Sequence, residues 1–178
     1  LAHTIARDMA NHPSDEHVLL AHSVGAMVLM PVLATLAEVP QCREAIKHLS
    51  VVTYGQVNPL LTLSDGPGVD RFRRQAGLIA AMDLPWLDLS APGDALCCVL
   101  TSPFASTEGP VRPVNLTIKS ARFDLRYDAE TFRKLKRRPF DLHFEYFRST
   151  AARQVFRHFD LLFGRGKWAD RLKPERMA

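Results

Sequence analysis

A serine stands at the junction between a short apolar run and a segment of helical character, in residues 21–25 with the sequence AHSVG. A serine held on a tight strand-to-helix turn exposes its hydroxyl above the sheet, and the first turn of the helix offers backbone N–H groups to a developing oxyanion. The usual pattern of such a nucleophile elbow is GxSxG, and here Ala21 replaces the first glycine. The pattern predicts Ser23 as a nucleophile. The alternative is that Ser23 only caps the helix, a position that serine favours.

A serine hydroxyl is a weak nucleophile until a base takes its proton, and that base is usually a histidine oriented by a carboxylate. In folds with a nucleophile elbow the chain order is serine, acid, histidine. Asp94 lies in a turn after an expected strand, at the edge where the functional groups of parallel sheets gather. We favour Asp94 over Asp88, which lies inside the strand and is expected to face a helix. The alternative for Asp94 is an aspartate that only stabilises its turn.

Seven histidines compete for the role of the base: His3, His12, His17, His22, His48, His143 and His158. The first five precede the expected acid and so break the chain order. His22 is next to Ser23, but its side chain is expected to point away from the serine. His143 lies among aromatic residues in the segment FDLHFEYF, where packing can shield and fix an imidazole. We predict His143 as the base, with a partly buried structural histidine as the alternative, and we expect His158 at the surface of an amphipathic helix.

The elements that must position these residues alternate along the chain. Unbroken apolar runs at 16–22, 48–54 and 84–89 have the length of strands and are typical of strands buried on both faces. Helices are expected over 1–11, 24–37, 40–47, 69–82, 129–138 and 150–163, and residues 114–123 alternate like a half-exposed strand. This order predicts an α/β fold, a mostly parallel sheet flanked by helices.

The composition is that of a globular domain, because 47% of the 178 residues are hydrophobic and 24% are charged. It excludes a disordered tail, a collagen-like repeat and a disulfide scaffold. Cys42, Cys97 and Cys98 show neither CxxC nor histidine-rich metal spacing, so no metal or other cofactor is predicted, and unpaired thiols favour a reducing compartment. No stretch reaches the ~18 uncharged apolar residues of a membrane span. We therefore expect a cytoplasmic location, with peripheral membrane association as the alternative.

The net charge of +4 is distributed unevenly. Residues 1–118 hold 7 Lys and Arg against 11 Asp and Glu, a net charge of −4, whereas residues 119–178 hold 16 against 8, a net charge of +8. The first interpretation is a solvated, helical basic face. The alternative is that this face contacts anionic lipid or nucleic acid. The chain has no zinc finger and no aromatic RNA-binding strand that would indicate nucleic acid specifically.

Four segments together resemble a group of bacterial α/β-hydrolase-fold proteins: VLLAHSVGA, LSVVTYGQVNPL, PWLDLSAPGDALC and FDLHFEYF. In this order they are similar to the group's nucleophile-elbow segment, the strand and loop after the elbow helix, the tryptophan-containing acid strand and the histidine segment. The similarity runs from about residue 13 to residue 150. It implies an esterase- or lipase-like serine hydrolase with a triad of Ser23, Asp94 and His143, and with the backbone N–H of Val24 as one oxyanion donor. No metal or organic cofactor is implied.

Members of that group have a substantial region before the elbow strand, whereas this chain has about one helix there and starts with leucine. We therefore expect residues 1–165 to be the C-terminal portion of a hydrolase domain whose N-terminal strands are absent, and residues 166–178 to be a basic, frayed tail. The elbow strand would then lie at an open edge, without the loop that supplies the second oxyanion donor. The expected substrate is a small ester or related acyl compound, and Phe144, Tyr146 and Phe147 suit either an apolar substrate or the core.

Two other classes of function stay open. One is a hydrolase fold without catalytic activity that serves as an interaction module through its basic C-terminal third. The other is a basic protein that binds an anionic membrane or nucleic acid and in which Ser23 is only a helix cap. The patterns do not indicate an oligomeric state.

Overall fold

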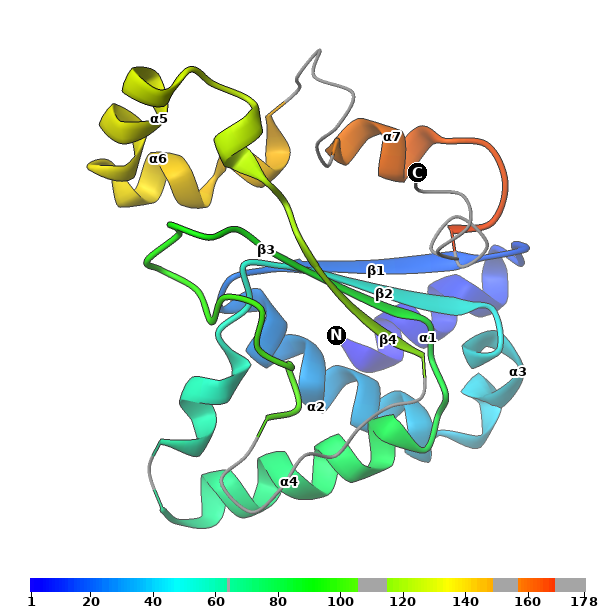
Figure 1. Cartoon of the computed structure of the whole chain (residues 1–178). Helices are drawn as coiled ribbons and strands as arrows, with labels where there is room; N and C mark the ends of the chain where they lie inside the picture. Colours follow the sequence, from blue (N-terminus) through cyan, green and yellow to red (C-terminus); the bar gives the residue numbers. More distant parts are fainter. Residues whose placement is uncertain (64, 106–114, 149–156, 169–178) are drawn as a thin grey trace.

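The structure, a computed structural model, describes residues 1–63, 65–105, 115–148 and 157–168. Four strands form one sheet: β1 (His17–His22), β2 (Leu49–Tyr54), β3 (Trp86–Ser90) and β4 (Leu116–Ser120). They lie in chain order across the sheet, and each pair of neighbours is parallel (Figure 1). The predicted α/β fold with a parallel sheet is therefore confirmed. Within the described sheet, β1 is an edge strand, with β2 as its one neighbour.

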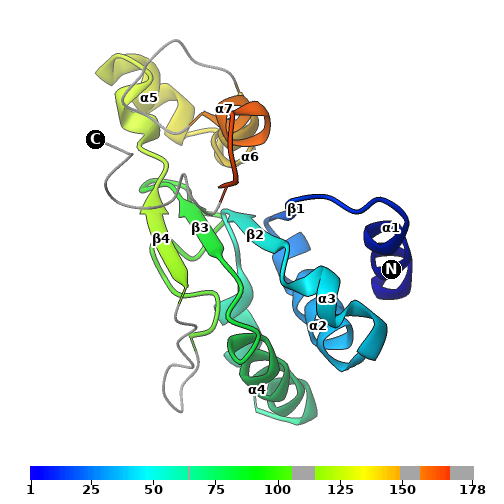
Figure 2. The same cartoon turned by 90° about the vertical axis from the view of Figure 1, so that its right-hand side faces the viewer.

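Helices cover both faces of the sheet, as Figures 1 and 2 show. On one side lie α1 (Ala2–Asn11), α2 (Gly25–Glu38), α3 (Arg43–Ile46) and α4 (Pro67–Ala80), with the short 3-10 helices η1 (Pro40–Cys42) and η2 (Asn58–Thr62). On the other side lie α5 (Ala129–Lys136), α6 (Pro139–His143) and α7 (His158–Phe163), with η3 (Phe123–Leu125) and η4 (Glu145–Phe147). Among the described helices, none combines the length and the apolar character needed to cross a lipid bilayer.

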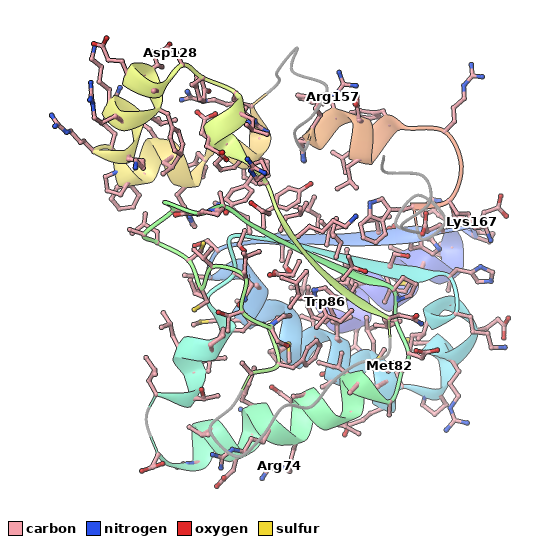
Figure 3. The ribbon with its side chains drawn as sticks, viewed as in Figure 1. Arg74, Met82, Trp86, Asp128, Arg157 and Lys167 are labelled. Carbon is pink, nitrogen blue, oxygen red and sulfur yellow. The ribbon has the colours of Figure 1, made fainter. Side chains whose placement is uncertain are left out.

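Alternate residues of the strands pack into two separate cores, because successive side chains of a strand point to opposite faces. Val51 of β2 and Trp86 of β3 belong to the core on the side of α2 and α4, and Figure 3 shows Trp86 between the sheet and these helices. Val52 and Tyr54 belong to the core on the side of α6 and α7, together with Leu142. Every residue of β2 and β3 is buried, as the unbroken apolar runs predict, whereas β4 is only partly buried along its length.

The C-terminal end of the described chain differs from the expected frayed tail at 166–178. Trp168 is 1% exposed and packs in the core on the α6–α7 side, and its backbone N–H donates to the carboxylate of Glu16. The indole buries a large apolar surface, which fixes the chain at least to residue 168. Residues 169–178 lie outside the described residues. The helix expected over 150–163 is present as α7 from residue 158, and residues 149–156 lie outside the described residues as well.

Candidate active site

Ser23 lies on a tight turn between the end of β1 and the start of α2. Its backbone N–H donates to the carbonyl of Tyr54 at 2.9 Å, which continues the β1–β2 pairing by one residue, and its φ is +56°. A positive φ is uncommon for a residue other than glycine and is held only where the surroundings enforce it. The N-cap position of α2 is Val24, without a side-chain cap, so the alternative of a Ser23 cap is not what the structure shows. The conformation is that of a strained strand-to-helix elbow.

Small residues on both sides of the turn allow the strand and the helix to approach. A β-carbon placed on Gly25 would lie 4.0 Å from the β-carbon of Ala21, which is ordinary van der Waals contact. The replacement of the first glycine of the pattern by alanine therefore fits the turn. No hydrogen bond from the backbone N–H of Val24 to a described residue is found. This N–H is available as the predicted oxyanion donor, since α2 begins at the next residue.

Asp94 and His143 form a buried hydrogen-bonded pair. Nδ1 of His143 lies 2.9 Å from Oδ2 and 3.1 Å from Oδ1 of Asp94, and the two residues are 3% and 1% exposed. Asp94 follows β3 in a turn in which its backbone N–H donates to the carbonyl of Ala91, and its Oδ1 also accepts the N–H of Leu96. The aspartate thus stabilises its turn and binds the histidine at the same time. The structure brings together these two predicted residues from positions 49 residues apart.

The electrostatics of the pair favour an ionised aspartate. Burial acts to raise the pKa of the Asp94 carboxyl, but the hydrogen bonds and charge of His143, together with the Leu96 N–H, outweigh it and hold the pKa below its usual value. Because Nδ1 of His143 faces a carboxylate, Nδ1 carries the proton and Nε2 is the acceptor nitrogen of the neutral ring. Nε2 is buried and has no hydrogen-bond partner among the described residues. A neutral imidazole with an unpartnered acceptor nitrogen is what a general base requires.

Gly55 links the serine to the histidine. It follows β2 directly, with φ +49°, and a β-carbon on it would lie only 3.1 Å from Cε1 of His143. Ser23 lies beside the same point, since His22 pairs with Tyr54 in the register of β1 and β2 and Ser23 follows it. Ser23 and the imidazole therefore both lie at the carboxyl end of β2. The described hydrogen bonds join Asp94 with His143 but do not include one between the Ser23 hydroxyl and Nε2.

His22 supports the histidine from the strand side. Its Nε2 donates to the carbonyl of His143 at 2.9 Å, and the two imidazole rings lie 4.4 Å apart between centroids. Burial is the main cause that lowers the pKa of His22, so the ring is held in its neutral form. Its ring lies in an aromatic cluster with His143, Phe144, Tyr146 and Phe147. The sequence patterns assign no role to His22. The feature that could have indicated its contact with His143 is its position next to Ser23.

Tyr146 is a second residue that sequence reasoning missed. Its hydroxyl donates to Oδ2 of Asp94 at 3.0 Å and accepts the backbone N–H of Ala91 at 3.0 Å. It was expected only as an aromatic of the substrate site or the core, and it is fully buried in the core. The available signal was its position three residues after His143, in the same aromatic segment FDLHFEYF.

The two alternative residues, Asp88 and His158, lie elsewhere. Asp88 is fully buried inside β3 and accepts the hydroxyl of Thr53 at 2.6 Å, on the side of α2 and α4 as expected, and burial raises the pKa of its carboxyl to about 7. His158, expected at the surface, is only partly exposed. It lies half-buried against Phe147, with Nδ1 3.0 Å from the hydroxyl of Tyr54, because α7 packs back onto the end of β2.

A thiol also lies close to the aspartate–histidine pair. The Cys97 side chain is near Asp94 and Tyr146, but burial, followed by the charge of Asp94, raises the pKa of this thiol to about 12, so it is not a reactive thiolate. Across the described part of the chain, no group of three or more His, Cys, Asp and Glu side chains could hold a metal ion.

Comparisons with models of protein families, with curated proteins and with solved structures gave no match to this chain. The described residues define an α/β protein with a parallel sheet of four strands. A buried aspartate–histidine pair and a serine turn at positive φ lie at the carboxyl ends of these strands.

Proposed function

We propose that the protein is a serine hydrolase of the α/β-hydrolase type that cleaves an ester or related acyl bond. The observation that carries the proposal is the pair of Asp94 and His143, whose buried Nε2 has no described partner, next to a serine held at positive φ. Three further features support it: the order serine, acid, histidine along the chain, the parallel sheet, and the position of all three residues after or above its carboxyl ends.

In the proposed reaction, the Ser23 hydroxyl attacks the acyl carbonyl while Nε2 of His143 takes its proton. The Asp94 carboxylate stabilises the imidazolium that forms, and the N–H of Val24 donates to the oxyanion of the tetrahedral intermediate. The imidazolium then gives its proton to the leaving alcohol. A water molecule, deprotonated by Nε2, attacks the acyl-serine in the same way, which releases the acid and restores Ser23.

The neighbourhood of the reacting residues favours an apolar acyl group. Val24, next to the nucleophile, is 59% exposed, and Phe144, next to the base, is 52% exposed. Solvent-exposed apolar side chains on both sides of a reacting centre can bury part of an acyl chain. Formation of the hydrogen bond between Ser23 and Nε2 is the one rearrangement that the proposal requires, and catalytic hydrogen bonds commonly tighten only when substrate binds.

A fluorophosphonate probe, which reacts with activated serines, tests the proposal on the full protein. We expect the protein to be labelled, and Ser23→Ala to abolish the labelling. His143→Gln and Asp94→Asn should slow labelling by about a thousandfold or more, as loss of a member does in related triads. Ser14→Ala removes an exposed serine in a loop before β1 and serves as the matched control, with labelling unchanged. An unlabelled wild-type protein, or equal labelling of Ser23→Ala, would refute the proposal.

A further inference from the structure

The hydroxyl of Tyr146 has its proton directed at the Asp94 carboxylate. The backbone N–H of Ala91 can only donate, and it lies 3.0 Å from the Tyr146 oxygen. It therefore occupies an acceptor position of the hydroxyl. The single phenolic proton is directed at the nearer acceptor, Oδ2 of Asp94 at 3.0 Å, rather than at Sγ of Cys97 at 3.9 Å. With its one hydroxyl group, Tyr146 thus accepts the N–H of Ala91, the first residue after β3, and donates to Asp94, the acid of the candidate site.

The carboxylate of Asp94 is held by donors on both of its oxygens. Oδ2 accepts from Nδ1 of His143 and from the hydroxyl of Tyr146, and Oδ1 accepts the N–H of Leu96 at 3.1 Å. A carboxylate bound in this way cannot rotate without breaking at least one bond to a charged acceptor, and such bonds are the stronger ones in proteins. Tyr146 and His143 come from one short segment, so that segment is attached to the acid at two points.

The ring that carries this hydroxyl is fixed by its surroundings. It stacks on Tyr54, with ring centroids 5.6 Å apart and planes 9° apart, and it meets the edge of Phe123 at 4.8 Å. Gly55 lies on a third side of the ring, so close that a β-carbon on it would be 3.0 Å from Cε2 of Tyr146. A ring packed on three sides holds its oxygen at a constant place, which is the requirement for orienting another group.

We infer that Tyr146 is a positioning residue that fixes the Asp94 carboxylate and reduces its pull on the proton of the His143 imidazolium. The inference rests on the proposed function in assigning His143 as the base. A hydrogen bond from the phenol withdraws negative charge from the carboxylate, so the carboxylate stabilises the imidazolium less. The imidazolium that forms when Ser23 gives up its proton can then pass that proton on to the leaving group more readily.

Tyr146→Phe tests the inference because it keeps the packed ring and removes only the hydroxyl. NMR titration of labelled His143 should show its imidazolium pKa raised by about one unit relative to the wild type, as expected for loss of a hydrogen bond to a charged group. The acid limb of the probe-labelling rate against pH should shift in the same direction, and the rate near neutral pH should fall by about tenfold. Removing the acid by Asp94→Asn should abolish the effect of Tyr146→Phe on the titration, since the effect acts through Asp94.

Tyr127→Phe is the matched control. Its hydroxyl also donates to a buried carboxylate, Oε2 of Glu145 at 2.6 Å, but not to the acid of the site. Because Arg126 and Arg148 still pair with the Glu145 carboxylate in this variant, we expect its His143 titration to equal that of the wild type. An unchanged titration in Tyr146→Phe, or a shift of the same size in Tyr127→Phe, would overturn the inference.

Two properties of the test keep it independent of folding and of activity. In the unmodified protein, the hydroxyl proton of Tyr146 should exchange slowly with solvent, and its chemical shift should change as His143 titrates. A chemical shift that stays constant during the titration of His143 would refute the inference without the need for a variant. The titration needs no turnover. A shifted titration in a protein that the probe does not label would support the positioning role while refuting the proposed hydrolase.

Discussion

At the scale of single residues, the candidate site depends on Gly55 being a glycine, with no side chain. The positive φ of this residue suits glycine, and the imidazole of His143 and the ring of Tyr146 both lie against the position that a β-carbon would take. The histidine can therefore lie against the backbone at the end of β2, directly beside the serine turn. A residue with a β-carbon would occupy the space that the imidazole uses.

We predict that Gly55→Ala displaces His143 and abolishes most of the probe labelling. The new β-carbon would lie 3.0–3.1 Å from atoms of Tyr146 and His143, and the backbone would be strained, so the free energy of unfolding should fall by about 1–3 kcal/mol. Labelling kinetics and urea unfolding measure the two effects. Gly77→Ala, in α4 with no atom within 4 Å of the added carbon, should keep full labelling and gain about 0.5–1 kcal/mol. Unimpaired labelling of Gly55→Ala would contradict the assigned position of His143.

At the scale of elements, the segment formed by α6 and η4 is attached to the rest of the molecule by a buried ion pair. Glu145 is fully buried, and its carboxylate lies 3.5 Å from Nη1 of Arg126, which also donates to the carbonyl of Glu145 at 2.6 Å. Arg148 and the hydroxyl of Tyr127 bind the same carboxylate. Because Glu145 is two residues after His143, this ion pair holds the segment that delivers the histidine. Short helices such as α6 and η4 gain little stability from their own hydrogen bonds, so tertiary contacts must hold them.

Glu145→Gln should lower the free energy of unfolding by about 3 kcal/mol, because it removes the negative charge that lies 3.5 Å from the buried guanidinium of Arg126. Glu130→Gln provides the comparison, since the ion pair of Glu130 with Lys134 is 62–72% exposed and such pairs contribute about 0.2–1 kcal/mol. Urea unfolding of both variants measures the difference. Equal losses in the two variants would show that the Arg126–Glu145 pair does not hold the segment.

At the scale of the whole molecule, the parallel sheet could be predicted, because unbroken apolar runs that alternate with helical periodicity are compatible with few other architectures. The pairing of Asp94 with His143 could be predicted from the turn and the chain order. The roles of Tyr146 and His22 could not, since they depend on which aromatic side chains meet when α6 packs over the sheet. Trp168 and His158 differ from the prediction for the same reason: local charge suggests exposure, but long-range packing buries Trp168 and half-buries His158.

The pH dependence of global stability is a further property of the whole molecule. Burial raises the pKa of Asp88 to about 7, above its unfolded value, so its contribution to stability is present at low pH and is lost as the pH rises towards 7. Asp88→Asn, which keeps an acceptor for Thr53, should remove this loss, on the order of 2 kcal/mol between about pH 5 and pH 8. Urea unfolding at both pH values checks it, and a variant with the same difference as the wild type would refute the raised pKa.

The backbone conformation at Ser23 also restricts how this site could change during evolution. Threonine carries the same hydroxyl chemistry, but its branched β-carbon is strongly disfavoured at a φ of +56°. Cysteine has an unbranched side chain like that of serine, so the turn disfavours it no more than it disfavours Ser23. The turn therefore permits Ser23→Cys, which replaces the hydroxyl by a thiol. Ser23→Thr is the smaller chemical change, from a primary to a secondary alcohol, but it would require a different backbone conformation of the turn.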